Sequence, residues 1–266
     1  MPALMLLRKL EQVMTLTNAE RQTIADLPER VLQVPAREDI VPGGSRPTEV
    51  RLIRAGIACR NNVVQDGRRQ ITSFLVPGDC CDLRALLMGH MDHTVTALAP
   101  CDVAVVPHER LFAAIEKCPR LALALWSDTL LDAAIHREWV TNVGRRSAYA
   151  RIAHLFCEIW FRLQSVGLPH DHTFHLPATQ GDLGDATGLS LVHVNRTLRQ
   201  LREDGLISVS KGRIVRLLDW QRLTEVAEFD PAYLQAANFR TGPAAPTDLP
   251  RKLQVFAWGK DAIALP

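Results

Sequence analysis

One short stretch of this sequence carries side chains suited to contacts with nucleic-acid bases. The guanidinium of Arg196 is a planar fork that matches O6 and N7 of guanine. Asn195 and His193 could reach base edges or phosphates, and Val192 could touch a thymine methyl group. Six Lys or Arg and four Asp or Glu lie between residues 179 and 218. We predict that Arg196 and these three neighbours read bases, whereas an isolated arginine would more often only solvate a helix face.

A further set of polar and basic side chains in the same stretch is suited to phosphate oxygens. Hydrogen bonds to phosphates position a protein on a duplex without reading its sequence. The residues predicted to make such contacts are Thr179, Gln180, Ser190, Arg199, Lys211 and Arg213.

Capping residues predict two helices that would position these side chains. Thr179 can cap a first helix, and Gly188 can end it because glycine tolerates a positive φ. Ser190 can cap a second helix over Leu191–Glu203. Arg196 then lies one turn into the second helix, whose N-terminal part enters the major groove in a helix-turn-helix.

Two short apolar runs follow the second helix and complete a known motif. Ile207–Ser210 and Ile214–Leu218 are predicted to pair as a β-hairpin across Lys211-Gly212. Helix, glycine turn, helix and hairpin together predict a winged helix-turn-helix. A winged helix that contacts only proteins is an alternative, against which the basic residues argue.

The first half of the chain has the pattern of a compact β-domain. Turn signals at Pro42-Gly43-Gly44, Asp66-Gly67 and Pro77-Gly78-Asp79 separate segments rich in Val, Ile and Thr, and Asp66-Gly67 is typical of a hairpin. Thr17 and Glu20 form a capping-box pattern at the start of a short preceding helix. The segments predicted to form an antiparallel barrel or roll are Val50–Arg60, Ile71–Val76, Thr94–Leu98 and Val103–Val106.

A long helix is predicted from Pro119 to about Gly144, followed by a second helix over Ser147–Val166. The first of these has an apolar seam at spacings of three and four, and further leucines, such as Leu130, lie largely off that seam. Such a helix needs two partners, the β-domain and the same helix of a second subunit, whereas burial within one subunit is the alternative. The predicted dimer seam comprises Trp126, Thr129, Ala133, His136 and Val140.

Composition limits the class of protein. With 266 residues, 47% of them hydrophobic, the chain can bury a core and form two domains. Its 31 Lys and Arg nearly balance 29 Asp and Glu, so the bulk charge does not test nucleic-acid binding. The six cysteines form no C-x-x-C pair, and neither a signal peptide nor a membrane span is visible, so we predict a reduced cytoplasmic protein without a membrane partner. The absence of a P-loop, a nucleophile elbow and an H-E-x-x-H motif predicts that it is not an enzyme.

The motif from Thr179 to Ile207 resembles that of the Crp/Fnr family of bacterial transcription factors: T-Q-x-x-L-x-x-x-x-G-L-S-x-x-x-V-N-R-x-L-x-x-L-x-x-x-G-L-I. Asp66-Gly67-Arg68 and Pro77-Gly78-Asp79 support the resemblance, which covers roughly residues 15–225. It implies an α+β fold with a cyclic-nucleotide-binding-like antiparallel β-roll, a long dimerisation helix and a C-terminal winged helix-turn-helix. It also implies a homodimer that binds inverted repeats in double-stranded DNA and acts on RNA polymerase.

The resemblance also implies domain boundaries and roles for individual residues. Arg196 matches the arginine of the family's recognition helix, whereas Val192 stands where many members carry a base-reading glutamate, so a different half-site is expected. The implied parts are 1–118 for the β-roll with its N-terminal helix, 119–145 for the dimerisation helix, 146–225 for the winged helix-turn-helix and 226–266 for a partly linker-like extension.

The residues with which family members bind cyclic AMP are missing from this sequence. Members that bind cyclic AMP use a Gly-Glu and an Arg-Ser pair, which are replaced here by Asp82-Leu83 and His93-Thr94. A buried cyclic phosphate would lack a fixed positive charge, so we predict neither cyclic-nucleotide dependence nor a cofactor. An effector pocket would instead involve Cys80, Cys81, Asp82, His93 and Thr94.

Other kinds of sensor stay open as alternatives. A haem could use Pro2 and residues of this same loop region, and the two adjacent cysteines could be a thiol switch rather than small buried hydrophobes. His90, Asp92 and His93 could bind a metal, although a solvated loop is the simpler interpretation. An iron–sulfur cluster is not expected, because the first cysteine is Cys59 and the family's cluster cysteines lie near the N-terminus.

Overall fold

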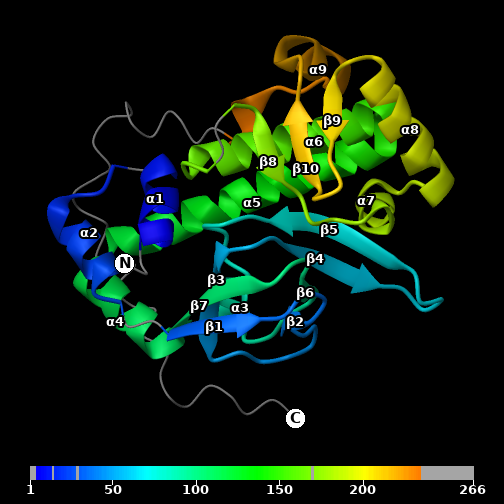
Figure 1. Cartoon of the computed structure of the whole chain (residues 1–266). Coiled ribbons are helices and arrows are strands. Elements are labelled where there is room, and N and C mark those ends of the chain that lie inside the picture. The colour runs from blue at the N-terminus through cyan, green and yellow to red at the C-terminus, as the bar shows by residue number, and fades with distance from the viewer. Residues whose placement is uncertain (1–3, 14, 28–29, 169–170, 235–266) are drawn as a thin grey trace.

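The computed structural model describes residues 4–13, 15–27, 30–168 and 171–234, so most of the predicted C-terminal extension lies outside the described residues. A β-rich first half is followed by a largely helical second half (Figure 1). The elements are α1 (Leu4–Val13), α2 (Asn18–Ala25), β1 (Arg30–Val34), β2 (Asp39–Val41), β3 (Glu49–Ala55), β4 (Ala58–Val63), β5 (Arg69–Leu75), α3 (Ala85–Met88), β6 (Thr94–Ala97), β7 (Cys101–Pro107), α4 (His108–Lys117), α5 (Arg120–Arg145), α6 (Ala148–Ser165), β8 (Thr173–His175), α7 (Gln180–Thr187), α8 (Leu191–Glu203), β9 (Ile207–Val209), β10 (Ile214–Leu217), α9 (Trp220–Ala227) and the 3-10 turn η1 (Pro231–Leu234).

The first half folds as the predicted antiparallel β-roll. One sheet has the strand order β1-β7-β3 and the other β2-β6-β4-β5, and all neighbouring strands are antiparallel. The Asp66-Gly67 turn joins β4 to β5, with Gly67 at a φ of 82°. The run Val50–Arg60 is not one strand, because it breaks at Gly56, which has a φ of 90°. A Cβ there would lie 2.6 Å from the carbonyl oxygen of Pro100, so only glycine fits this turn.

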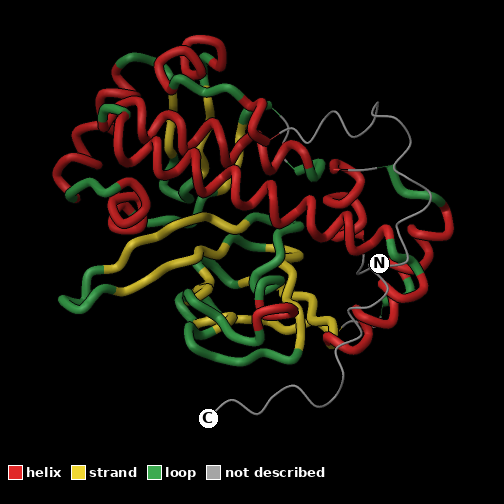
Figure 2. The backbone as a smooth tube through the Cα atoms, turned by 180° about the vertical axis from the view of Figure 1, so that it is seen from behind, coloured by secondary structure: helices red, strands yellow, loops and turns green. Residues whose placement is uncertain are grey.

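Helix α5 runs between the β-roll and the C-terminal half, and α6 lies along it (Figure 1, Figure 2). Pro119 is its N-cap rather than its first helical residue. Helices α1, α2 and α4 gather at one end of the roll, where α1 and α4 also contact α5. Helices α1, α4 and α9 are absent from the sequence-based prediction. Helix α4 begins without a side-chain cap, whereas Asp219 caps α9 and was an available signal.

The second half contains the predicted winged helix-turn-helix. The hydroxyl oxygen of Thr179 accepts from the backbone N–H of Asp182 at the start of α7, and Gly188 ends that helix at a φ of 66°. Ser190 caps α8 in the same way. The wing has three strands in the order β8-β10-β9, because Thr173–His175, which is not part of the predicted hairpin, also pairs with β10.

The two halves share a core. One apolar cluster joins Cys59 and Phe74 of the roll to Trp139 of α5, Phe156 of α6 and residues of the winged helix. All six cysteines are free thiols. No described helix is long and apolar enough to span a membrane.

Candidate nucleic-acid interface

Helix α8 has one buried and one exposed face. Val194, Leu198 and Leu201 are buried, on the side that packs against α6 and α7. Because residues three or four apart share a face of a helix, burying this side turns Val192 and Arg196 to solvent. The exposed face is that of the first turns of α8, the part of a recognition helix that enters a major groove.

The four predicted base-reading residues differ in how free their side chains are. Val192 is 76% exposed. The Arg196 side chain is exposed and forms no hydrogen bond or ion pair with any residue that the structure describes. Asn195 donates from Nδ2 to a carbonyl oxygen of its own helix at 3.2 Å, and the His193 ring nitrogen Nδ1 lies 3.1 Å from the Ser190 hydroxyl. Of the four predicted base-reading residues, Arg196 and Val192 could therefore reach a base without first breaking a side-chain hydrogen bond.

The predicted phosphate-contacting residues lie on or next to α7, α8 and the wing. The exposed members are Gln180, Ser190, Arg199, Lys211 and Arg213. The Thr179 hydroxyl donates to the Asp182 carboxylate at 2.7 Å, so it is committed to the helix cap. Arg213, at a φ of 57°, donates to the carbonyl oxygen of Pro177 and holds the wing to the segment before α7.

Comparisons with known proteins agree with this geometry. The model of the Crp-like helix-turn-helix domain matches residues 150–226, and that of the cyclic nucleotide-binding domain matches residues 31–118. The transcriptional activator protein FnrL of Cereibacter sphaeroides is 32% identical over 201 residues, which cover 73% of this chain and 79% of that protein. This chain belongs to the Crp/Fnr family of transcriptional regulators.

Two more relatives have regulatory names or the same fold. The nitrogen fixation regulation protein FixK of Azorhizobium caulinodans is 29% identical over 69% of this chain and 74% of its own length. The structure of FixK2 from Bradyrhizobium japonicum matches with a TM-score of 0.68 and 27% identity, covering 75% of this chain and 98% of that one. The family resemblance is thereby confirmed, and this Crp/Fnr regulator is not an enzyme.

Helix α5 of this Crp/Fnr regulator carries an apolar stripe that no described residue covers. Trp126 is 63% exposed and Val140 is 74% exposed. Leu130, predicted to lie off the seam, is part of the stripe at 55% exposure, whereas His136 lies at its edge, with Nδ1 2.8 Å from a carbonyl oxygen of the same helix. The predicted seam residues that are exposed or half-buried on the stripe are Trp126, Thr129, Ala133 and Val140.

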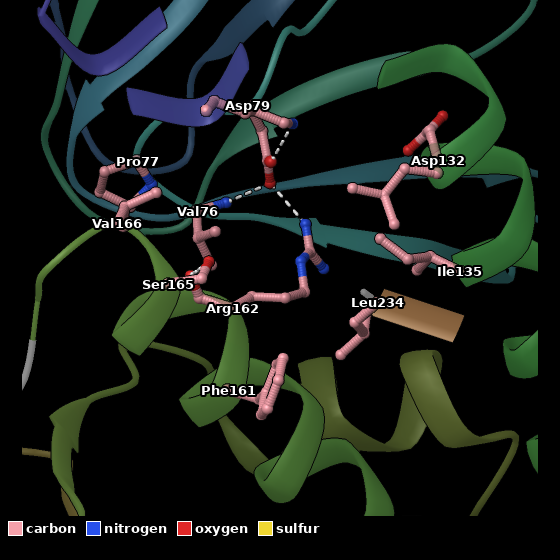
Figure 3. Close-up of a pocket in the computed structure, with 12 residues that line it drawn as sticks. Val76, Pro77, Asp79, Asp132, Ile135, Phe161, Arg162, Ser165, Val166 and Leu234 are labelled. Atoms are coloured by element: carbon pink, nitrogen blue, oxygen red, sulfur yellow. Dashed lines mark hydrogen bonds and ion pairs between the residues drawn. The ribbon is translucent and has the colours of Figure 1, made fainter. Parts of the chain in front are cut away.

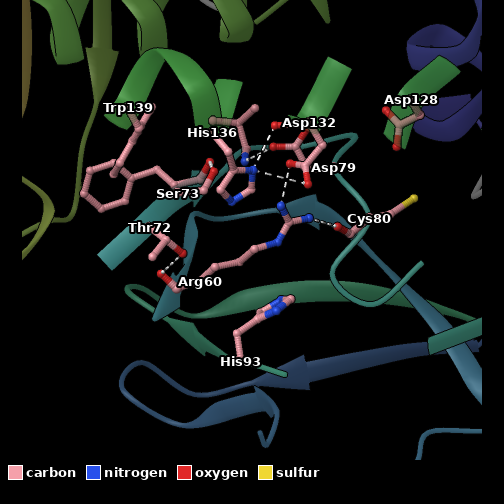
Figure 4. A network of polar contacts seen from close by, with 12 residues as sticks. Arg60, Thr72, Ser73, Asp79, Cys80, His93, Asp128, Asp132, His136 and Trp139 are labelled. Carbon is pink, nitrogen blue, oxygen red and sulfur yellow. Dashed lines mark hydrogen bonds and ion pairs between the residues drawn. The ribbon is translucent and has the colours of Figure 1, made fainter. Parts of the chain in front are cut away.

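A cavity of about 560 Å³ lies where the β-roll faces α5, and Figure 4 labels several of the residues that line it. Of the predicted effector residues, those that line it are Cys80, Cys81 and His93. Asp82 is not among the lining residues, since its carboxylate accepts from Arg51 Nη1 at 2.8 Å and from the Arg51 backbone at 2.7 Å. Thr94 is also not among them, and its hydroxyl oxygen accepts from the backbone N–H of Gly43 at 3.0 Å.

The charges that line this cavity are already paired. Lys9 Nζ lies 2.6 Å from Asp79 and 2.9 Å from Asp128, and Arg60 bonds to Asp132 of α5 (Figure 4). A further ion pair is Arg84–Asp92, and the rings of His93 and His136 lie beside the carboxylates of Asp92 and Asp132. A cyclic phosphate would therefore have to compete with an aspartate for each of these positive charges.

The two adjacent cysteines lie in surroundings that disfavour thiol chemistry. Burial raises the pKa of Cys80, and Asp128 raises it further. Burial likewise raises the pKa of Cys81, with Asp82 adding to the effect. Because the thiolate is the reactive form, this burial favours the interpretation as small buried hydrophobes over a thiol switch. Pro2 lies outside the described residues, and among those described no three His, Cys, Asp or Glu are grouped to hold a metal ion.

Proposed function

We propose that this chain is a sequence-specific DNA-binding regulator that grips an inverted-repeat operator as a homodimer. The observation that carries the proposal is the unengaged Arg196 guanidinium on the exposed face of α8. The apolar stripe of α5 can pack against the same stripe of a second subunit. The resulting two-fold dimer carries two α8 helices, one for each half of an inverted repeat. FnrL is named a transcriptional activator, so we extend the proposal to action on RNA polymerase, in the cytoplasm where the chromosome lies.

Selection of fragments from a randomised DNA pool by the purified full chain, without added ligand, tests the proposal. The expected product is an inverted repeat whose half-site centres lie about 10–10.5 base pairs apart, or a multiple of that spacing. Binding should weaken steeply as salt rises, because phosphate contacts release counterions. A pool that shows no enriched sequence would contradict the proposal.

Val140→Glu is expected to convert the dimer to a monomer. Residues near a two-fold axis meet their own copies, so two carboxylates would face each other in an apolar seam. Val140 is 74% exposed in the single chain, so the monomer itself should fold normally. Light scattering measures the change, with Thr141→Glu, at the next exposed position, as the matched control expected to stay dimeric. A wild type that is monomeric with and without DNA would refute the dimer.

Cyclic AMP at about 1 mM is expected to change neither the melting temperature nor the operator affinity. The cations of the roll cavity are paired with aspartates, so a phosphate gains no free positive charge there. A site with a Kd of about 10 μM would instead stabilise the folded protein by about 2.7 kcal/mol at this concentration. A thermal scan and a binding titration, each with and without the nucleotide, decide between the two.

A further inference from the structure

The first helix of the winged helix, α7, is tied to the β-roll by a group of four side chains that we name the clamp. Arg37, between β1 and β2, and Arg69, the first residue of β5, both reach Asp182 of α7. Arg37 Nη1 lies 2.9 Å and Arg69 Nη2 2.5 Å from Oδ1 of that carboxylate. Arg69 also donates from Nε to Asp185 at 2.9 Å.

Asp182 serves the clamp and the start of α7 at once. Its Oδ2 accepts from the backbone N–H of Thr179 and from the Thr179 hydroxyl, each at 2.7 Å, while Oδ1 faces the two arginines. The side chain is only 2% exposed. Burial alone would raise the pKa of Asp182, but the bonds from Thr179, Arg69 and Arg37 outweigh burial and lower it, so the carboxylate stays charged at neutral pH.

The clamp lies at a strained point of the backbone. Arg37 has a φ of 73°, a conformation that costs a residue other than glycine free energy. Its own backbone N–H donates to the carbonyl oxygen of Ala97 at 2.7 Å, which holds it in this turn. At the opposite end of α7, Arg151 of α6 donates to the carbonyl oxygen of Thr187 at 2.7 Å. Both ends of α7 are therefore held, and α8 packs against α7.

We propose that Arg37 and Arg69 are positioning residues for DNA binding, which hold the winged helix in the orientation that reads the operator. The inference rests on the proposed function. In the clamped arrangement α7 lies between the roll and α8, so the face that carries Val192 and Arg196 is uncovered (Figure 1). A dimer binds two half-sites at once only when its two winged helices are held at the spacing of those half-sites. If a winged helix is loosely held, the operator affinity falls in proportion to the fraction of time that it is correctly oriented.

The β4–β5 hairpin connects the clamp to the cavity between the β-roll and α5. Arg69 starts β5, and Thr72, three residues further along that strand, lines the cavity, as does Arg60 on the paired strand β4. A molecule bound in this cavity, between the β-roll and α5, that displaced the β4–β5 pair would move Arg69 and hence α7. The clamp thus links the sensor-like domain to the reading helix through one strand.

The test compares Arg69→Ala with Arg68→Ala by titrating the full-length dimer onto its selected operator. The two arginines are adjacent and carry the same charge, but the Arg68 side chain is 83% exposed and, among the described residues, forms an ion pair only with Asp66 of its own turn. We expect Arg69→Ala to weaken operator binding about tenfold, and Arg37→Ala/Arg69→Ala to weaken it further, because the winged helix loses its fixed orientation. Arg68→Ala should change the operator affinity less than about twofold. Arg69→Lys, which keeps one charged donor, should recover part of the loss.

Amide hydrogen exchange gives a second readout that separates positioning from unfolding. Release of the clamp should speed exchange in α7 and at the start of β5, with α6 and the buried side of α8 unchanged. If the wild type binds its operator and Arg37→Ala/Arg69→Ala binds it equally well or more tightly, the positioning role is overturned while the proposed function stands. A wild type that enriches no operator overturns the proposed function, and the positioning role with it.

Discussion

Replacing Arg196 by alanine is expected to remove most of the protein's preference for its operator over unrelated DNA. A bidentate contact from arginine to guanine is worth about 1–3 kcal/mol of discrimination, and a homodimer makes it twice, so the loss should reach about 2–6 kcal/mol. The fold should be unaffected, because the Arg196 side chain is exposed and forms no hydrogen bond or ion pair with any residue in the described part of the chain. Competition binding with the operator and with a scrambled duplex measures the ratio directly.

Two further variants separate base reading from simple charge. Arg196→Lys keeps the charge but loses the planar fork, so it should bind DNA without recovering the preference. Arg199→Ala removes a charge from the same exposed face of each subunit. It should weaken binding to operator and scrambled DNA alike, and lower the salt dependence by about two counterions, one for each subunit of the dimer. An unchanged ratio in Arg196→Ala would show that other residues read the bases.

The elements that position Arg196 could be predicted because their signals are local. Thr179 and Ser190 accept backbone N–H groups within three residues of themselves, and Gly188 adopts the positive φ that ends α7. The Asp66-Gly67 turn likewise depends only on its neighbours along the chain. Such caps and turns act on the adjacent backbone, so residue type and spacing are enough to reveal them.

The contacts between the domains could not be predicted in this way. Arg60 meets Asp132, which lies 72 residues further on, and Arg69 meets Asp182 at a separation of 113 residues. Neither pair has a sequence pattern, because the partners come together only once the roll, α5 and α7 have packed. Asp79 was visible only as the third residue of a Pro-Gly-Asp turn. The same limit applies to the effector residues, of which Asp82 pairs with Arg51 and does not line the cavity.

Asp79→Asn is expected to lower the free energy of unfolding by about 3–5 kcal/mol, as breaking one side of a buried ion network does. The Asp79 carboxylate is 9% exposed and accepts from Lys9 Nζ at 2.6 Å and from Arg162 Nη2 at 2.5 Å (Figure 3). These bonds join α1, the Pro-Gly-Asp turn and α6. With a neutral amide at this position, Lys9 is still paired with Asp128, and Arg162 is still paired with Glu158 at 3.3 Å. The positive charges of Lys9 and Arg162 are then only partly compensated in the protein interior. Urea unfolding of the full chain measures the difference.

Asp66→Asn is the matched control, because it removes the same charge from an ion pair in which Asp66 is 51% exposed. It should lower the free energy of unfolding by less than about 1 kcal/mol.

The two variants should also differ in how their stability depends on pH. Burial alone would raise the pKa of Asp79, but Arg162 and Lys9 outweigh it and lower the pKa from 3.8 to about 2. A depressed pKa stabilises the fold above the unfolded value, and this contribution is lost as the pH falls from about 4 to 2. The gap in stability between wild type and Asp79→Asn should therefore shrink by about 2 kcal/mol over that window, while a gap that stays constant would show that the Asp79 charge does not stabilise the network.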